Sequence, residues 1–242
     1  KRVFMEYSPL LIIITALTSF ITAITGVGGG MTLIAILPSF LPAHILIPVH
    51  GVTQLFSNIS RAFFGYKEIY LEALPKYLIG SLVGVALFSS LLLYLSFTYI
   101  PLFIGVYILL SLWSRKFDLI LKKFESYYIM GFLQSGLSLF VGATGPMSMP
   151  MLMKDCKDPN QVVVTVAALS SITHTLKIFV FIALGFAFFD YLELMILMVV
   201  GSVLGSYLGT LVRKKINIKH LVLFIKILLS CLAIKSIYQV LI

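Results

Sequence analysis

Long apolar segments separated by short polar stretches dominate this chain. Four of them, residues 78–95, 162–189, 192–212 and 221–242, are largely apolar over the length of a membrane crossing, since about 20 helical residues span a hydrocarbon core of about 30 Å. Other apolar segments are shorter and end near glycine, proline or charged residues. The pattern predicts an all-α, polytopic membrane protein.

Two glycine clusters interrupt apolar segments where a continuous helix would otherwise cross the membrane. The first break has the sequence GVGGG at residues 26–30, and the second break has GATGP at 142–146. Backbone N–H and C=O groups that lose their helical hydrogen bonds inside the membrane must face a cavity or a bound solute, because lipid cannot form hydrogen bonds with them. The segments that restart at Gly30 and Pro146 are expected to begin as helix N-termini, whose free amides favour an anion. Close helix packing is the alternative role for such glycines, but the repetition favours a site.

The two halves of the chain repeat each other at an offset of 116 residues, which becomes 121 after a short insertion. The first offset aligns the breaks and places Asn58 on His174 and Arg61 on Lys177, and the second aligns two G-S-x-x-G motifs. Each half is therefore predicted to form a glycine-broken helix pair followed by three helices. In the first half these helices are 10–25, 31–41, 45–66, 77–95 and 99–113. In the second half they are 127–141, 147–153, 161–186, 192–212 and 221–242.

An odd number of segments inserts the second half upside down, as in transporters built from inverted-topology repeats. We therefore expect a single transmembrane domain, residues 1–242. Repeat one, 8–114, and repeat two, 126–242, would be joined by a cytoplasmic loop, 115–125.

Charge is scarce and mostly basic. The chain is 60% hydrophobic and 11% charged, with a mean hydropathy of +1.07 and a net charge of +9. Basic residues gather in the loops 115–125, 213–219 and 67–76, which the positive-inside rule assigns to the cytoplasm, so the charge reflects topology rather than nucleic-acid binding. The loop near 190–193, which corresponds to 67–76 in the first half, has no cation, as expected if the second half is inserted upside down. The two basic residues at 1 and 2 argue against this topology, because they would lie outside the cytoplasm.

Polar side chains inside apolar segments are costly unless they face protein or water. His174 is the sharpest candidate, because histidine titrates near neutral pH. Lys177 precedes a long uncharged stretch and is expected to attract an anion, whereas Arg61 is near enough to the next loop to extend its charge to the surface. The alternative for each polar residue is a hydrogen bond between helices. The predicted anion site comprises Gly28, Gly29, Gly30, Gln54, Ser57, Asn58, Arg61, Gly145, Pro146, Met147, Thr173, His174 and Lys177.

The sequence carries no signature of catalysis or of metal or cofactor binding. Acidic residues lie outside the predicted spans, and Cys156 and Cys231 have neither zinc nor disulfide spacing. No phosphate-binding loop occurs, and no carboxylate near His174 in sequence could orient it for nucleophilic catalysis. We therefore expect no enzyme activity, no metal and no cofactor.

The glycine motif and the two-half plan resemble the TauE/SafE family of sulfite and organosulfonate exporters. The likeness rests on G-x-G-G-G at 26–30, its degraded form G-x-x-G-P at 142–146 and the polar helix after each, and it covers essentially the whole chain. It implies a multi-pass inner-membrane permease that moves sulfite, sulfoacetate or related organosulfonates out of the cell. Thr144 and Pro146 depart from the family's glycine-rich pattern.

These observations predict a secondary transporter that holds its anion at the midplane between the breaks and alternates access by rocking one repeat against the other. Energy would come from the solute's own gradient or from a coupled proton. The expected partners are a small anionic solute, protons, the lipid bilayer and, in a homodimer, a second copy of the chain, with no nucleic acid. An anion channel that uses the breaks as a filter and a non-transporting membrane scaffold are the alternatives.

Overall fold

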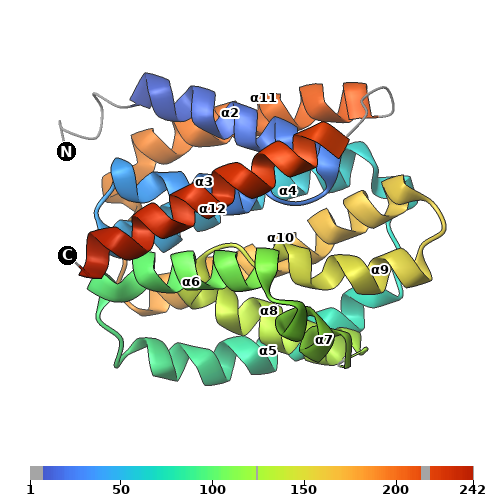
Figure 1. The fold of residues 1–242 in the computed structure, drawn as a ribbon, viewed down its shortest axis with the longest axis horizontal. Coiled ribbons are helices and arrows are strands. Elements are labelled where there is room, and N and C mark those ends of the chain that lie inside the picture. The colour runs from blue at the N-terminus through green and yellow to red at the C-terminus, as the bar shows by residue number, and fades with distance from the viewer. Residues whose placement is uncertain (1–7, 124, 214–218, 242) are drawn as a thin grey trace.

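The computed structural model describes residues 8–123, 125–213 and 219–241. This part of the chain consists of helices joined by short turns and contains no strand (Figure 1), so the all-α prediction is confirmed. The α-helices are α2 (Ser8–Thr25), α3 (Gly29–Ile36), α4 (Ala43–Phe64), α5 (Ala73–Leu92), α6 (Ile100–Trp113), α7 (Arg115–Lys123), α8 (Tyr127–Val141), α9 (Met149–Asp155), α10 (Pro159–Ala183), α11 (Leu192–Val212) and α12 (Lys219–Leu241). Short 3-10 helices are η1 (Leu37–Ser39), η2 (Tyr66–Glu68), η3 (Phe97–Tyr99), η4 (Gly145–Ser148) and η5 (Phe188–Tyr191).

Four helical stretches of the described residues are long and apolar enough to cross a membrane. They are Ala73–Leu92, Pro159–Ala183, Phe188–Val212 and Leu221–Leu241. Their outer faces expose large apolar side chains, such as Phe179 at 63% and Leu204 at 54%, which would form an extensive apolar surface on a soluble protein. Helix α4 is also long, with 22 residues, but it buries a row of polar side chains. The predicted membrane character is confirmed.

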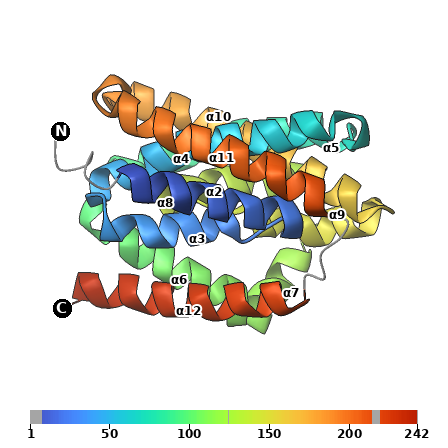
Figure 2. The ribbon, with the colours of Figure 1, turned by 90° about the horizontal axis from the view of Figure 1, so that it is seen from above.

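The first helix of each half packs against the fourth helix of the other half. Helix α2 lies along α11, and α8 lies along α5 (Figures 1 and 2). A Cβ added to Gly80 would lie 1.8 Å from the Tyr128 carbonyl oxygen, and one added to Gly201 would lie 2.5 Å from that of Ile12. These two contacts are related by the sequence offsets of 121 and 116 residues. The matched packing supports the two-repeat plan, while the upside-down insertion of the second repeat stays a prediction.

Helices α3 and α9, which follow the two breaks, extend toward opposite ends of the molecule (Figures 1 and 2). The end that holds α9 also holds α7 and the last turn of α11. We call it the basic end, because its elements carry or adjoin Arg115, Lys116, Lys154, Lys157 and Arg213. The positive-inside rule predicts that the basic end faces the cytoplasm, and this orientation stays a prediction.

The stretch 115–125, predicted as a loop, contains helix α7. Basic and apolar residues recur there at helical spacing, so the segment can turn one face to a core or a membrane interface and the other to water. The loop prediction overlooked this periodicity.

The first break interrupts the backbone as predicted. Three residues separate the end of helix α2 at Thr25 from the start of α3 at Gly29, and φ is +82° at Gly26 and +97° at Gly28. Such positive φ values are readily adopted only by glycine. The glycines are therefore what permits the chain to reverse here.

The second break has a different ending. Gly142 has a φ of +77°, but the 3-10 helix η4 comes next and α9 starts only at Met149, three residues after the start expected at Pro146. The Met147 amide donates to the Thr144 carbonyl oxygen at 3.1 Å, which is a 3-10 rather than an α-helical bond. The second half therefore has no α-helix N-terminus directly at its break.

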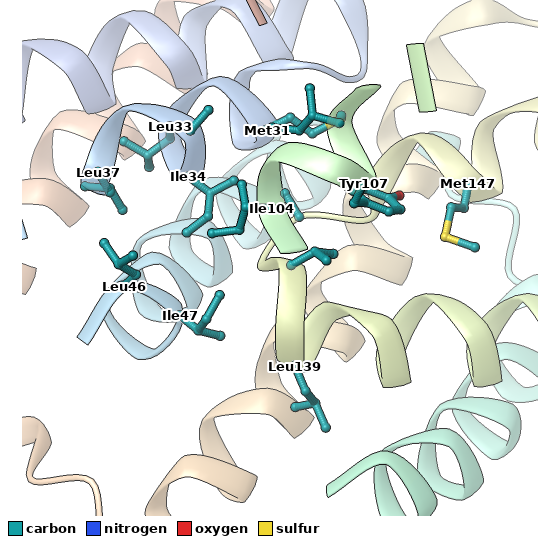
Figure 3. Close-up of a cluster of buried hydrophobic side chains, with 14 of the residues drawn as sticks. Met31, Leu33, Ile34, Leu37, Leu46, Ile47, Ile104, Tyr107, Leu139 and Met147 are labelled. Atoms are coloured by element: carbon teal, nitrogen blue, oxygen red, sulfur yellow. The ribbon is translucent and has the colours of Figure 1, made fainter. Parts of the chain in front are cut away.

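Buried apolar side chains tie the second break to the helices that follow the first (Figure 3). A Cβ added to Gly142 would lie 2.8 Å from Ile34 Cγ1 of α3 and 3.3 Å from Ile47 Cδ1 of α4. Leu139 and Met147 belong to the same apolar cluster. This packing brings the two breaks together in the interior.

Candidate functional site

A small cavity lies between the two breaks. Its volume is about 30 Å³, which is room for roughly one or two water molecules. A Cβ added to Gly30 of the first break would lie 3.8 Å from the Ala143 Cβ of the second. The lining residues are Thr22, Gly26, Val27, Gly28, Gly30, Met31, Gln54, Asn58, Arg61, Ala143, Gly145, Val166, Ser170 and His174.

Arg61 is the cation of this cavity. Its side chain is only 3% exposed, so the expectation that it extends to the membrane surface is wrong. One guanidinium nitrogen donates to Asn58 Oδ1, and Asn58 Nδ2 donates to the Gln54 carbonyl oxygen at 2.7 Å. The other terminal nitrogen, Nη1, is buried and has no hydrogen-bond partner among the described residues.

No carboxylate among the described residues is buried. Apart from tyrosine hydroxyls, the buried ionisable side chains of the breaks and their neighbours are instead basic: His50, Arg61, His174 and Lys177. Burying a cation without a counter-ion is expensive. An anion at this place would offset that cost.

Three of these basic groups form a row between the breaks. His50 Nε2 lies 2.9 Å from the Gly30 carbonyl oxygen, and the rings of His50 and His174 meet edge to face with centroids 5.8 Å apart. His174 Nδ1 lies 3.3 Å from Lys177 Nζ, which donates to the Gly142 carbonyl oxygen at 2.6 Å. The row therefore connects a carbonyl of the first break to a carbonyl of the second.

His50 was missing from the predicted site because it lies near the start of its helix in the sequence. The spacing of the sequence could have identified it, because His50, Gln54 and Asn58 lie four residues apart. Residues at that spacing share one face of a helix. Gln54 and Asn58 line the cavity, and His50 holds the Gly30 carbonyl beside it.

Seven of the predicted site residues line the cavity: Gly28, Gly30, Gln54, Asn58, Arg61, Gly145 and His174. Lys177 does not line it and lies one turn behind His174. Gly29 faces α2, because a Cβ there would lie 1.8 Å from the Thr18 carbonyl oxygen. Met147 is buried in the apolar cluster. Pro146 belongs to η4, and its side chain lies outside the described part of the structure.

Ser57 and Thr173, also predicted for the site, hold helices together. Ser57 Oγ donates to Ser19 Oγ at 3.0 Å and lies 3.1 Å from Ser206 Oγ. Thr173 Oγ1 lies 2.7 Å from the Tyr77 hydroxyl and 2.9 Å from Ser135 Oγ. The Ser57–Ser19 and Thr173–Ser135 contacts are related by the offset of 116 residues, so both halves use the same interhelical bond.

The described residues contain no group of three or more His, Cys, Asp and Glu side chains that could hold a metal ion. Cys156 and Cys231 are free thiols. The groups at the cavity are amides, hydroxyls and buried bases, which are able to donate hydrogen bonds to an anion.

Membrane-length apolar helices around a buried, positively charged cavity are typical of a membrane permease. The family model for the sulfite exporter TauE/SafE matches residues 11–236. The chain therefore belongs to this family, a family of membrane transporters, and the resemblance inferred from the glycine motif is confirmed. No curated protein and no solved structure matches the chain.

Proposed function

We propose that this protein is a secondary transporter that exports small sulfur-containing anions, such as sulfite, sulfoacetate or related organosulfonates, across the inner membrane. The anion would be held at the cavity between the two breaks. The observation that supports this most strongly is Arg61, a buried guanidinium without a carboxylate partner among the described residues, on a cavity that both breaks line.

The proposed binding mode combines charge with polar groups. Arg61 Nη1 would donate to one anion oxygen, and the side chains of Gln54 and His174 would donate to others. The first-turn amides of α3, which have no partner within their helix, would add the favourable end of the helix dipole. The shared feature of the proposed solutes is an oxyanion with several acceptor atoms, which suits an array of donors.

The size of the cavity favours small solutes. At about 30 Å³ it has room only for water-sized contents, so any anion must move side chains such as Met31 when it binds. Sulfite, the smallest of the proposed anions, requires the least movement. Such rearrangement on binding is what a transporter that alternates access requires.

Proton coupling fits the row of basic groups. Gln54, Asn58 and Arg61 on α4 and His174 on α10 line the same cavity, Lys177 lies one turn behind His174, and Tyr77 is the nearby ionisable group from α5. No carboxylate among the described residues is buried to balance a positive charge on the row of His50, His174 and Lys177. Protonating this row therefore costs the least free energy when an anion is bound beside it. We propose that a proton and the anion bind together, which predicts tighter anion binding at mildly acidic pH and loss of that dependence in His174→Gln.

The anion site can be tested with purified protein. Sulfite is expected to raise the melting temperature of the wild type, because a ligand at about 100 times its Kd stabilises the native state by about 2.7 kcal/mol. Arg61→Gln should abolish the shift and Arg61→Lys should keep part of it. Lys116→Gln, at an exposed position of α7, is the matched control and should behave as the wild type.

Flux in proteoliposomes separates the three functional classes. A transporter shows saturable sulfite flux and counterflow, a channel passes sulfite current without counterflow, and a scaffold shows neither. Wild-type protein that neither binds nor moves sulfite or sulfoacetate would contradict the proposed function.

A further inference from the structure

A second and much larger cavity opens at the basic end. It has a volume of about 600 Å³, within the range of small-molecule sites. The end of α2, helix α9, the start of α10 and Arg213 enclose it. We call this cavity the vestibule.

A single layer of side chains separates the vestibule from the cavity between the breaks. Gly26 lines the inner cavity, whereas Met149 and Val163 line the vestibule. A Cβ added to Gly26 would lie 3.0 Å from Val163 Cγ2 and 3.3 Å from Met149 Cε. In the described part of the structure, this apolar contact therefore lies between the two cavities.

Arg213 places a partly buried cation on the vestibule wall. Its Nε atom is buried and has no hydrogen-bond partner among the described residues. Glu68 and Asp158 attract it through space, but Asp158 already accepts the Asn160 amide at the start of α10, at 2.9 Å. Lys157 is a second cation on the vestibule wall.

The charges of Arg213 and Arg61 also act on each other. Arg213 lines the vestibule and Arg61 lines the inner cavity, so both cavities have a positive potential that attracts an anion. An anion that neutralises either group relieves their mutual repulsion, and it would be attracted stepwise from the outer group to the inner one.

We propose that the vestibule is the cytoplasmic access route of the transported anion, that Arg213 is its outer binding group, and that Met149 and Val163 form the inner gate. This inference rests on the proposed function for the identity of the anion. The route itself rests on the two cavities, their shared wall and the position of the basic end.

Kinetics test the role of Arg213. With sulfite supplied on the side of the basic end, Arg213→Gln should raise the half-saturating concentration about threefold to tenfold at low ionic strength, less at high salt, and leave the maximal rate unchanged. Arg213→Lys should restore most of the affinity, and Lys116→Gln should not change it. Unchanged half-saturation in Arg213→Gln, in a preparation whose wild type transports sulfite, overturns the role of Arg213.

Cysteine labelling tests the route independently of transport. Native Cys156 is a poor probe, because burial and then Asp155 raise the pKa of its thiol, so Val163→Cys and Met153→Cys are placed in a Cys156→Ser, Cys231→Ser background. Met153 lies on the vestibule wall and is 65% exposed, so its substitution should not disturb folding. Phe189→Cys, 88% exposed on η5, is the orientation control, because η5 immediately precedes α11 and the last turn of α11 lies at the basic end.

A membrane-impermeant thiol reagent should label Met153→Cys and Val163→Cys only from the basic end, and Phe189→Cys only from the other side. Sulfite should slow the labelling of Val163→Cys. Labelling of both vestibule positions from the side that labels Phe189→Cys overturns the route. Absence of sulfite flux in the wild type contradicts the proposed function, and the labelling result then still decides the access route.

Discussion

The two breaks occupy matched places in the two halves, yet they are built differently. The first break leads directly into an α-helix at Gly29, and two of its glycines have positive φ values. The second leads into a 3-10 turn, and only Gly142 has a positive φ. The two breaks therefore occupy matched sequence positions but differ in local structure.

The side chains around the second break hold it to its neighbours. Lys177 donates to the Gly142 carbonyl oxygen at 2.6 Å, and Thr144 Oγ1 donates to the Gln134 carbonyl oxygen at 2.8 Å. At the first break, the matched cation Arg61 makes no bond to the break and lines the cavity instead. Under the proposed function, the first break presents the anion site and the second supports it.

The largest expected effect is at Gly29. A Cβ there would lie 1.8 Å from the Thr18 carbonyl oxygen, whereas one at Gly145 would meet nothing nearer than Ser170 Oγ at 3.7 Å. We expect Gly29→Ala to lower the free energy of unfolding by about 3 kcal/mol or more, because backbone cannot move aside, and Gly145→Ala to change it by less than about 1 kcal/mol. Thermal unfolding of the two variants measures the difference, and equal losses would show that the breaks are structurally alike.

The next comparison separates the two matched cations. Lys177→Met leaves the Gly142 carbonyl without its donor and should lower the free energy of unfolding by about 1–3 kcal/mol, with a small loss of sulfite affinity. Arg61→Gln should have the opposite pattern: the free energy of unfolding should change little, and sulfite binding should be lost. Melting curves with and without sulfite measure both quantities. Loss of sulfite binding in Lys177→Met at unchanged stability would instead place Lys177 in the anion site.

The smallest effect is expected where the halves are alike. Ser57→Ala and Thr173→Val each remove matched interhelical hydrogen bonds, which are worth about 0.6 kcal/mol on average in membrane proteins. Both variants should unfold at slightly lower temperature and keep the sulfite half-saturation of the wild type. A large rise in half-saturation for either variant would return that residue to the site.

Helix positions were largely predictable. Residues 127–141 and 192–212 were expected as helical segments, and α8 and α11 have these bounds, because apolar runs bounded by polar, charged or glycine residues leave little choice in a membrane. The main differences are α7, which the prediction treated as a loop, and the start of α9, where η4 replaces the first turn.

The site was predictable only in part. The sequence pointed to matched polar residues but could not separate cavity-lining side chains, such as Asn58, from interhelical contacts, such as Ser57. It also favoured Lys177 over Arg61, although Arg61 is the one that lines the cavity. That choice depends on which helix lies opposite each side chain, which is a long-range property.

The sequence alone determined the membrane character, the two breaks, the repeat and the family, because each follows from local composition and spacing. Only the tertiary structure decided the convergence of the breaks on one small cavity, the row from His50 to Lys177 and the vestibule beside Arg213. These features join residues from several helices, so their geometry follows from how the helices pack rather than from any one segment.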